Sequence, residues 1–375
     1  MAILNHMQFF FVAILFALTT KISTCTTTSS VKGIYWLEQP LFPSSSINTS
    51  LFTHVFYAFL QPNNVTYKLD IPTSTAAKLT AFTATMQAKT SPASTLISIG
   101  GAVSYNALFA FIASNPAARA AFITSTINAA RTFGFDGLDF DWEYPRNATE
   151  MNDLGSLLKD WRLAVNAESS ATGLPPLLLT AAVYFAADVT VDGVARTYPV
   201  ASFNQNLDFV NVMTYDLHGA WSNETGAPAG LFDPDSNLSV AKGLVSWIRS
   251  GAIPAKLVMG LPLYGRTWQL RDPNLHGIGA EAVGVGPGLD GAMAYFQVLD
   301  FIEETGAKVV YDVGTVSVYS HSGSNWVGYD DLQTVAAKVG FAQALSLRGY
   351  FFWAAGLDTT DWKISTHASK AWRLA

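Results

Sequence analysis

The stretch of sequence that decides the fold, residues 135–145, reads FDGLDFDWEYP. Three acidic residues, Asp139, Asp141 and Glu143, alternate in it with large apolar ones. Successive side chains of a β-strand point to opposite faces, so the three carboxylates share one face. Carboxylates spaced about 6–7 Å apart on a buried face repel one another and lose hydration, which favours keeping at least one of them protonated. The pattern therefore predicts a strand over 137–144 whose acidic face carries out catalysis.

The acidic strand has two other interpretations. A solvated acidic edge would turn the apolar residues inward and place the acids outside, where helices cover a parallel barrel. A metal site is the second alternative, but the six histidines are scattered along the chain and none lies close to another. We expect neither a metal nor a cofactor.

The acidic segment is one of eight short apolar runs that alternate with longer helical stretches. Their nearly continuous hydrophobicity is typical of strands buried on both faces of a parallel sheet. This alternation predicts a (β/α)8 barrel, with a doubly wound open sheet as the structural alternative. The runs are 31–37, 54–60, 95–101, 137–144, 177–185, 207–215, 256–264 and 349–355.

The helices between the runs carry clear start and stop signals. Asn115 followed by Pro116 predicts a helix beginning there, and Gly134 predicts its end in a left-handed cap. In the next helical stretch, the apolar side chains recur at the spacing of one helical face. Those side chains belong to Leu154, Leu157, Leu158, Trp161 and Val165.

One connection is too long for a simple barrel. More than 80 residues separate the seventh and eighth runs, where one helix would suffice. We therefore predict an α+β insertion over 266–327, on the rim where barrel active sites lie. The domain prediction is a signal peptide at 1–25, a catalytic barrel over 26–265 and 328–375, and this insertion.

Composition excludes several classes of protein. Half of the 375 residues are hydrophobic, which argues against general disorder. Charged residues make up only 13%, and the net charge is −6 without a basic run. A nucleic-acid partner is therefore not expected, because phosphate binding needs clustered Lys and Arg.

The N-terminus predicts secretion. An apolar run over 7–18, followed by small polar residues, favours a cleaved signal peptide over a membrane anchor. The single cysteine, Cys25, lies at the expected cleavage edge. Secretion to the extracellular space is expected, a vacuolar destination stays open, and the mature chain should act as a monomer without a membrane partner. Five glycosylation acceptor patterns agree with this and begin at Asn48, Asn64, Asn147, Asn223 and Asn237.

Several motifs together resemble glycoside hydrolase family 18, and within it the plant class V chitinases. The acidic motif DGLDFDWE at 136–143 carries most of the resemblance. Five further motifs follow the family's order along the chain. They are SIGG at 98–101, MTYD at 213–216, GLPLYGR at 260–266, WVGYDD at 326–331 and GYFFW at 349–353.

The resemblance implies four catalytic roles. Glu143 would be the general acid that protonates the glycosidic oxygen. Asp141 would orient the substrate's acetamido N–H, and Asp139 would hold Asp141 and share its proton. Tyr215 would donate its hydroxyl hydrogen to the acetamido carbonyl, whose oxygen attacks the anomeric carbon in these substrate-assisted enzymes.

The resemblance also implies a sugar-binding cleft. Trp353 would form the floor under the sugar at the cleavage point. Ordinary core packing remains the alternative for each aromatic residue. The other expected substrate contacts are Tyr35, Phe59, Met213, Asp216, Arg266 and Trp326.

The function implied is a secreted endo-chitinase that cleaves β-1,4-linked N-acetylglucosamine polymers, with chitin and chitooligosaccharides as partners. Two alternatives stay open. A chitin-binding lectin of the same ancestry would typically lack the acid that Glu143 supplies here. A lipo-chitooligosaccharide hydrolase would use the same chemistry with a different cleft shape.

Overall fold

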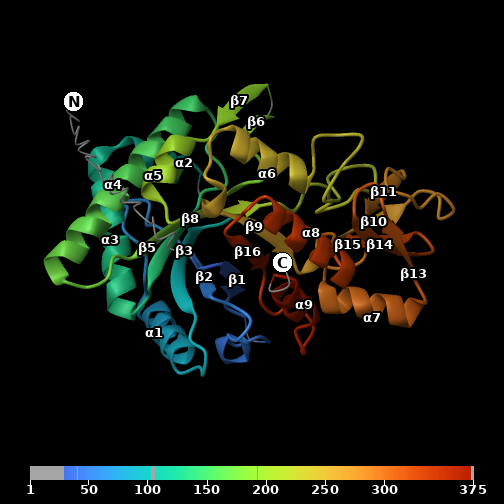
Figure 1. The fold of residues 1–375 in the computed structure, drawn as a ribbon, viewed down its shortest axis with the longest axis horizontal. Helices are drawn as coiled ribbons and strands as arrows, with labels where there is room; N and C mark the ends of the chain where they lie inside the picture. The colour runs from blue at the N-terminus through green and yellow to red at the C-terminus, as the bar shows by residue number, and fades with distance from the viewer. Residues whose placement is uncertain (1–28, 40, 103–105, 192, 373–375) are drawn as a thin grey trace, which may run out of the picture.

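A closed barrel of eight parallel strands forms the larger part of the protein (Figure 1). The structure, a computed structural model, describes residues 29–39, 41–102, 106–191 and 193–372, so the expected signal peptide and Cys25 lie outside it. All eight predicted runs form barrel strands, which confirms the (β/α)8 prediction over the open sheet. Around the barrel the strands are β1 (Val31–Leu37), β16 (Gly349–Trp353), β9 (Leu257–Pro262), β8 (Phe209–Met213), β5 (Leu178–Tyr184), β4 (Gly137–Asp141), β3 (Ser94–Gly100) and β2 (His54–Leu60).

Helices surround the barrel and bury one face each against it. On α4 the predicted apolar face is buried, with Leu157, Trp161 and Val165 fully covered. Among the described residues no single helix has the length and apolarity to cross a membrane. The helices α2 and α3, which meet at a bend of 107°, reach that length and apolarity only when taken together. The helices are α1 (Thr73–Gln87), α2 (Asn106–Ser114), α3 (Pro116–Phe133), α4 (Ala148–Thr172), α5 (Val200–Asn206), α6 (Val240–Arg249), α8 (Leu332–Ala344) and α9 (Lys363–Ala371), with short 3₁₀ turns at Ser44–Ser46 and Pro254–Lys256.

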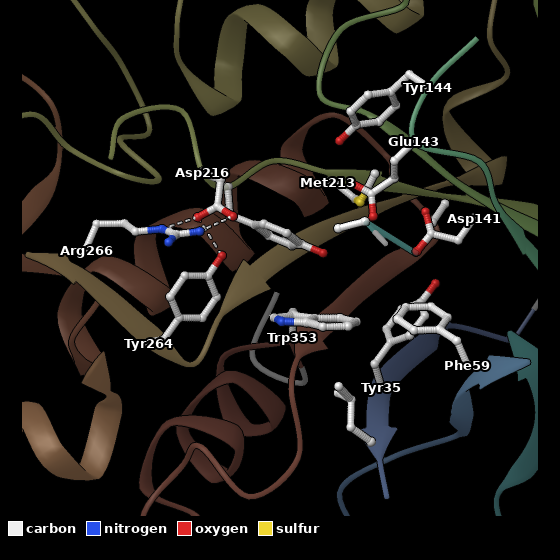
Figure 2. A pocket seen from close by; sticks show the side chains of 14 residues that line it. Tyr35, Phe59, Asp141, Glu143, Tyr144, Met213, Asp216, Tyr264, Arg266 and Trp353 are labelled. Atoms are coloured by element: carbon white, nitrogen blue, oxygen red, sulfur yellow. Dashed lines mark hydrogen bonds and ion pairs between the residues drawn. The ribbon is translucent and has the colours of Figure 1, made fainter. Parts of the chain in front are cut away.

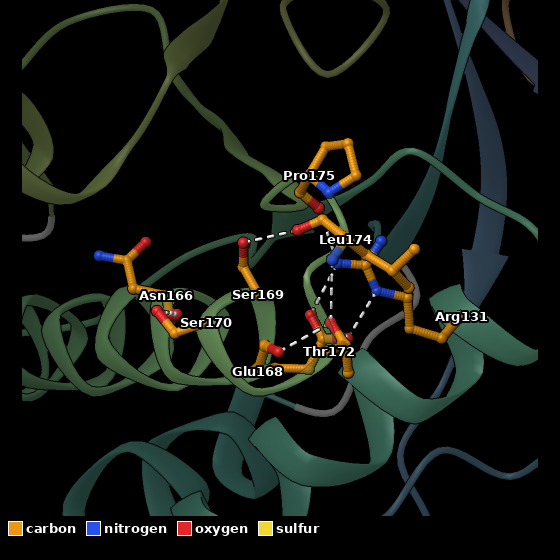
Figure 3. A network of polar contacts seen from close by, with 8 residues as sticks. All are labelled: Arg131, Asn166, Glu168, Ser169, Ser170, Thr172, Leu174 and Pro175. Atoms are coloured by element: carbon orange, nitrogen blue, oxygen red, sulfur yellow. Dashed lines mark hydrogen bonds and ion pairs between the residues drawn. The ribbon is translucent and has the colours of Figure 1, made fainter.

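The predicted caps of α3 are confirmed. The Asn115 side chain accepts hydrogen bonds from two backbone N–H groups of the first turn, and Gly134 closes the helix at φ 73°. Figure 3 shows how the end of α3 is tied to the end of α4: Arg131 forms a two-point ion pair with Glu168, at 2.9 and 2.6 Å, and donates to the carbonyl of Pro175 at 2.8 Å. These contacts fix the loop that leads into β5.

The strand that carries the acids is shorter than predicted. β4 pairs with β3 only as far as Gly100 and Asp141, so Glu143 lies beyond the strand rather than on it. A Cβ on Gly100 would lie 2.0 Å from the Asp141 carbonyl oxygen, and Gly101 N–H donates to that oxygen at 2.9 Å. The two glycines thus let the backbones meet closely below the acids, after which β4 has no further partner and ends.

A second sheet follows the C-terminal end of β9 and rejoins the barrel at α8, and it lies to the right in Figure 1. Its strand order is β11-β10-β15-β14-β13, and β12 pairs with β10. The exposed hairpin of β6 (Asp188–Val191) and β7 (Val194–Thr197) was not predicted. The inserted elements are β10 (Tyr264–Leu270), β11 (Ala282–Val285), β12 (Ala292–Ala294), α7 (Tyr295–Thr305), β13 (Lys308–Asp312), β14 (Ser317–Ser322) and β15 (Asn325–Tyr329).

Candidate active site

A cleft of ≈ 390 Å³ opens where the barrel strands end, with the inserted sheet contributing part of its wall (Figure 2). Most of the residues predicted for catalysis or substrate binding line it. The lining residues are Tyr35, Leu37, Phe59, Ala102, Asp141, Glu143, Tyr144, Ala182, Met213, Tyr215, Asp216, Tyr264, Arg266 and Trp353.

Asp139 lies below the cleft, fully buried inside the barrel. Its Oδ2 accepts hydrogen bonds from the hydroxyls of Tyr35 at 2.8 Å and Ser98 at 2.7 Å, and its Oδ1 accepts from Thr180 at 2.6 Å. Burial raises the pKa of Asp139, and the three hydrogen bonds oppose that rise because they stabilise the carboxylate. The three hydrogen bonds therefore favour a charged Asp139, against the larger effect of burial.

Asp141, the last residue of β4, lies between Asp139 and Glu143 in sequence and lines the cleft. Burial raises its pKa well above the usual value, and the charges of Glu143 and Asp139 raise it further. Its buried Oδ1 has no hydrogen-bond partner among the described residues. Asp141 thus lines the cleft with a raised pKa and a buried carboxyl oxygen that has no partner among the described residues.

Glu143 reaches the cleft from the loop after β4, and Figure 2 places it above the Trp353 ring. Burial raises its pKa, a hydrogen bond with Tyr144 opposes the rise, and the charge of Asp216 adds to it. A carboxyl group that keeps its proton towards neutral pH is suited to general acid catalysis.

Tyr215 follows β8 and lines the same cleft. Burial raises its pKa well above the usual value, and the negative charges of Asp141 and Glu143 contribute. The phenol therefore keeps its hydrogen over the whole physiological pH range and can only donate or accept a hydrogen bond as a neutral group.

Opposite the acids, a polar cluster joins the barrel to the inserted sheet. Asp216 accepts from Tyr264 at 2.8 Å and from Arg266 at 2.7 and 2.6 Å, as the dashed lines of Figure 2 show. The Arg266 guanidinium also lies 5.3 Å from the ring of Trp221, which is 65% exposed. The MTYD and GLPLYGR motifs, which contain Asp216 and Arg266, thus meet at the cleft rim.

The aromatic floor follows the prediction in part. Trp353 is half-buried at the end of β16 and lies flat in Figure 2, with its ring centroid 5.7 Å from Phe59 and 5.5 Å from Tyr35. Tyr35 is 1% exposed and stacks on Phe56 at 4.5 Å, so most of its ring belongs to the barrel core. Trp353 and Phe59 remain the residues with a face towards the cleft.

The prediction that Trp326 contacts substrate is wrong. Trp326 is 1% exposed and packs against Trp268 at 5.2 Å and Tyr319 at 5.1 Å, with its indole N–H donating to the His276 carbonyl. Trp326 pairs with Trp268, which lies two residues after Arg266 on β10. At this position the loop that carries His276 covers the Trp326 ring. Trp326 is a core residue of the inserted sheet.

Tyr144 and Tyr264 line the cleft but were not predicted to do so. Tyr144 directly follows the acidic motif that ends at Glu143, and Tyr264 lies two residues before Arg266 within GLPLYGR, so the motifs themselves were a usable signal. Exposed Trp221, which contacts the Arg266 guanidinium, could have been found as a tryptophan in the loop after MTYD. No group of three or more candidate metal ligands occurs in the part of the chain that the structure describes.

The five predicted glycosylation acceptors all have exposed side chains. The Asn147 side chain also caps α4 by accepting from the Glu150 N–H at 3.0 Å. Attachment of sugar at these sites stays a prediction.

Comparisons with known proteins agree with the motifs. The sequence model of the glycosyl hydrolases family 18 matches residues 27–358. The chain is 65% identical to two proteins of Medicago truncatula, class V chitinase CHIT5b over 344 residues and Nod factor hydrolase protein 1 over 350 residues. Each match covers 92% of this chain and 91% of the relative.

A solved structure matches the fold closely. It is a mutant class V chitinase from Nicotiana tobaccum in complex with NAG4, with a TM-score of 0.87 and 40% sequence identity. The match covers 92% of this chain and 99% of that one. The similarity therefore extends over the barrel and the inserted sheet alike.

Proposed function

The chain belongs to glycoside hydrolase family 18, and from this premise we propose that it is a secreted endo-chitinase with a substrate-assisted, retaining mechanism. Its substrates would be polymers and oligomers of β-1,4-linked N-acetylglucosamine. The observation that carries the proposal is that one cleft brings together Glu143, whose pKa is raised by burial, and Asp141, whose Oδ1 has no partner in the described residues.

The first step is protonation of the leaving group. Glu143 donates its proton to the glycosidic oxygen as the bond between that oxygen and the anomeric carbon breaks. The raised pKa of Glu143, caused chiefly by burial, supports this role because the group must enter the reaction protonated.

The attacking group comes from the substrate in this mechanism. Asp216 is held by Arg266 and Tyr264, and Asp139 receives hydrogen bonds from three hydroxyls below the cleft. These two carboxylates are thus already engaged, and the proposal assigns Asp141 to the acetamido N–H, so no side chain is given the attacking role. The carbonyl oxygen of the 2-acetamido group attacks it instead and forms a cyclic oxazolinium ion.

Asp141 and Tyr215 hold the acetamido group during this attack. The Asp141 carboxyl, whose Oδ1 has no partner in the described residues, accepts the acetamido N–H, and the neutral Tyr215 hydroxyl donates to the carbonyl oxygen. Glu143, now ionised, takes a proton from water, and the resulting hydroxide opens the ring at the anomeric carbon. Two inversions give a product of retained β configuration.

The proposal is tested by product analysis with N-acetylglucosamine hexamer and polymeric chitin, comparing the wild-type protein with Glu143→Gln. Shorter oligomers released by the wild type alone support it. Absence of products from both substrates at any pH between 4 and 8, with correctly folded protein, contradicts it. If the wild type releases no products, and it and Glu143→Gln bind hexamer equally tightly, the lectin alternative is indicated instead.

Hydrolysis of lipo-chitooligosaccharides is a second candidate function. It is favoured by the 65% identity to Nod factor hydrolase protein 1, which equals the identity to class V chitinase CHIT5b. Because the reaction chemistry would be the same, only substrate preference separates the two. Adding a lipo-chitooligosaccharide beside the hexamer and comparing kcat/KM values decides which substrate the cleft favours.

Secretion, to the extracellular space or the vacuole, is proposed from the apolar N-terminus and the exposed acceptor asparagines. Peptide mass spectrometry of the protein recovered from plant tissue tests it. A mature N-terminus near residue 26 and sugar on at least one acceptor are expected, whereas a protein beginning at Met1 without sugar would contradict secretion.

A further inference from the structure

Asn211 lies on β8 inside the barrel, fully buried below the cleft. Its Nδ2 donates to the hydroxyl oxygen of Tyr35 at 2.9 Å, and that hydroxyl donates to Asp139 Oδ2 at 2.8 Å. The chain of hydrogen bonds therefore runs from β8 through β1 to the first acid of β4. Neither the motifs nor the proposed mechanism assigns Asn211 a role.

The Asn211 amide determines which way the hydrogen bonds from Asn211 to Tyr35 and from Tyr35 to Asp139 point. An amide NH₂ group can only donate, so it must occupy a lone pair of the Tyr35 hydroxyl. The hydroxyl has one hydrogen, which the second hydrogen bond directs to Asp139. With Ser98 and Thr180 also donating, Asp139 receives three hydrogen bonds, and such donors favour the ionised form of a carboxyl group.

An ionised Asp139 determines where the shared proton lies. Asp141 is buried between the charges of Asp139 and Glu143, so its protonated form is the favoured one. Any weakening of the three bonds to Asp139 would let Asp139 compete for that proton. The titratable groups around the two aspartates are Tyr35 on β1, Glu143 and Tyr144 after β4, Tyr198 before α5 and Tyr215 after β8.

Packing alone does not explain an asparagine at this position. Its Oδ1 is buried without a hydrogen-bond partner among the described residues. A buried carbonyl without a partner destabilises a fold, and an apolar side chain of similar size would avoid that cost. On the same strand the inward-facing neighbours Phe209 and Met213 are apolar.

We propose that Asn211 is a positioning residue. By donating to Tyr35, Asn211 directs the tyrosine hydrogen to Asp139. Asp139 thereby stays ionised, and the shared proton stays on Asp141. This inference rests on the proposed function, in which Asp141 handles the acetamido N–H.

The test compares Asn211→Leu, which lacks the donor, with Val210→Ala as a matched control. Val210 is the next residue on β8, is 2% exposed and packs on the outer side of the barrel, so its truncation perturbs the same strand without touching Tyr35. The first readout is the titration of the aspartate carboxyl carbons by ¹³C NMR in the free protein, with the Asp139 signal assigned by Asp139→Asn.

Asn211→Leu should move the Asp139 titration to higher pH, while Val210→Ala leaves it in place and only lowers the melting temperature. In a Tyr35→Phe background the Asn211 change should add no further shift, because both substitutions break the same chain. On the acid limb of the pH profile, kcat/KM for N-acetylglucosamine hexamer should fall roughly 3–10-fold, the effect of losing one ordinary hydrogen bond.

An Asp139 titration that is unchanged in Asn211→Leu overturns the proposal, as does an equal shift in the Tyr35→Phe background. Asn211→Val, smaller and also without a donor, provides the same comparison if the leucine variant fails to fold. The NMR titration needs no substrate, so it decides the role of Asn211 even if the wild-type protein does not cleave hexamer and the proposed function fails.

Discussion

Asp216 and Arg266 form a two-point ion pair, with Nε at 2.7 Å and Nη2 at 2.6 Å from the two carboxylate oxygens. Asp216 comes from the loop after β8 and Arg266 from β10, so the pair joins the barrel to the inserted sheet at the cleft rim. Asp216 also acts through its charge, which raises the pKa of Glu143 in addition to the larger effect of burial. The rim contact and the proposed acid are therefore electrostatically linked.

Asp216→Asn should shift the pH dependence of hydrolysis towards acid. Removing the carboxylate charge lowers the pKa of Glu143, which must be protonated to act, so the alkaline limb of the kcat profile moves to lower pH. Asp300→Asn, the same charge change on the exposed face of α7, serves as the control and should leave the profile unchanged. An alkaline limb that stays in place or moves upward would show that Asp216 does not influence the acid.

Glu143→Gln should abolish hydrolysis and preserve binding. The amide keeps the shape of the side chain but has no transferable proton, and general acid–base catalysis contributes about 10²–10⁴-fold in rate. Calorimetric titration with N-acetylglucosamine hexamer should give a dissociation constant that can be measured without turnover. Glu303→Gln, on the exposed surface of α7, should match wild type in both assays. Hydrolysis by Glu143→Gln within tenfold of wild type would remove Glu143 from the role of acid.

The barrel could be predicted because its strands are buried on both faces, so each strand is a continuous run of apolar residues in the sequence. β1 and β2 match the predicted runs residue for residue. The β6–β7 hairpin escaped prediction because it is short and, where described, largely exposed, so no apolar run marks it. The predicted strand with the acids is longer than the observed β4 because the end of β4 is set by the partner strand, where Gly100 forms the last pair with Asp141.

The location of the site could be predicted from local motifs, but parts of its walls could not. Asp141 and Glu143 lie in the acidic segment, and Tyr215 lies in a motif that the family resemblance singled out. Trp326 was misplaced because its burial depends on the loop with His276, 50 residues away in sequence. Asn211 was overlooked because its only distinguishing feature is a contact with Tyr35, 176 positions distant.

The tryptophans Trp353 and Trp326 should respond in opposite ways to truncation. Trp353→Ala should lose affinity for hexamer with a modest loss of stability, since its ring is half-buried at the cleft floor. Trp326→Ala should lose about 3–5 kcal/mol of unfolding free energy, typical of emptying a large core site. Urea denaturation beside a binding titration measures both quantities. The floor assignment is contradicted if Trp353→Ala binds hexamer as wild type does.

Lys338 on α8 and Asp330 after β15 form an ion pair with side chains 0% and 2% exposed. Burial lowers the pKa of Lys338 and raises that of Asp330, while each opposes the shift of the other. Lys338→Met should cost about 3–5 kcal/mol because it leaves a buried carboxylate unpaired. The double variant Lys338→Met/Asp330→Leu should regain most of that loss. A double variant as unstable as the single one would show that the pair itself, not the orphaned charge, carries the stability.

Partly deacetylated chitosan should be cleaved only where an N-acetylglucosamine unit occupies the cleavage point. In the proposed mechanism the acetamido oxygen is the attacking group, and a glucosamine unit has none to offer. Mass spectrometry of the fragments should therefore find N-acetylglucosamine at every new reducing end. NMR of hexamer products within the first minutes should show the β anomer in excess, because two inversions retain configuration.

The chitosan experiment separates the proposed mechanism from a water attack assisted by a carboxylate base. That reaction would invert the anomeric carbon, giving the α anomer first, and would not require an acetyl group at the cleavage point. Asp141→Asn gives the internal control, since it keeps the shape of the side chain while weakening its hold on the acetamido N–H. It should slow cleavage without changing either the anomer or the acetylated reducing end. Glucosamine at new reducing ends, or an initial excess of the α anomer, would show that the acetamido group is not the nucleophile.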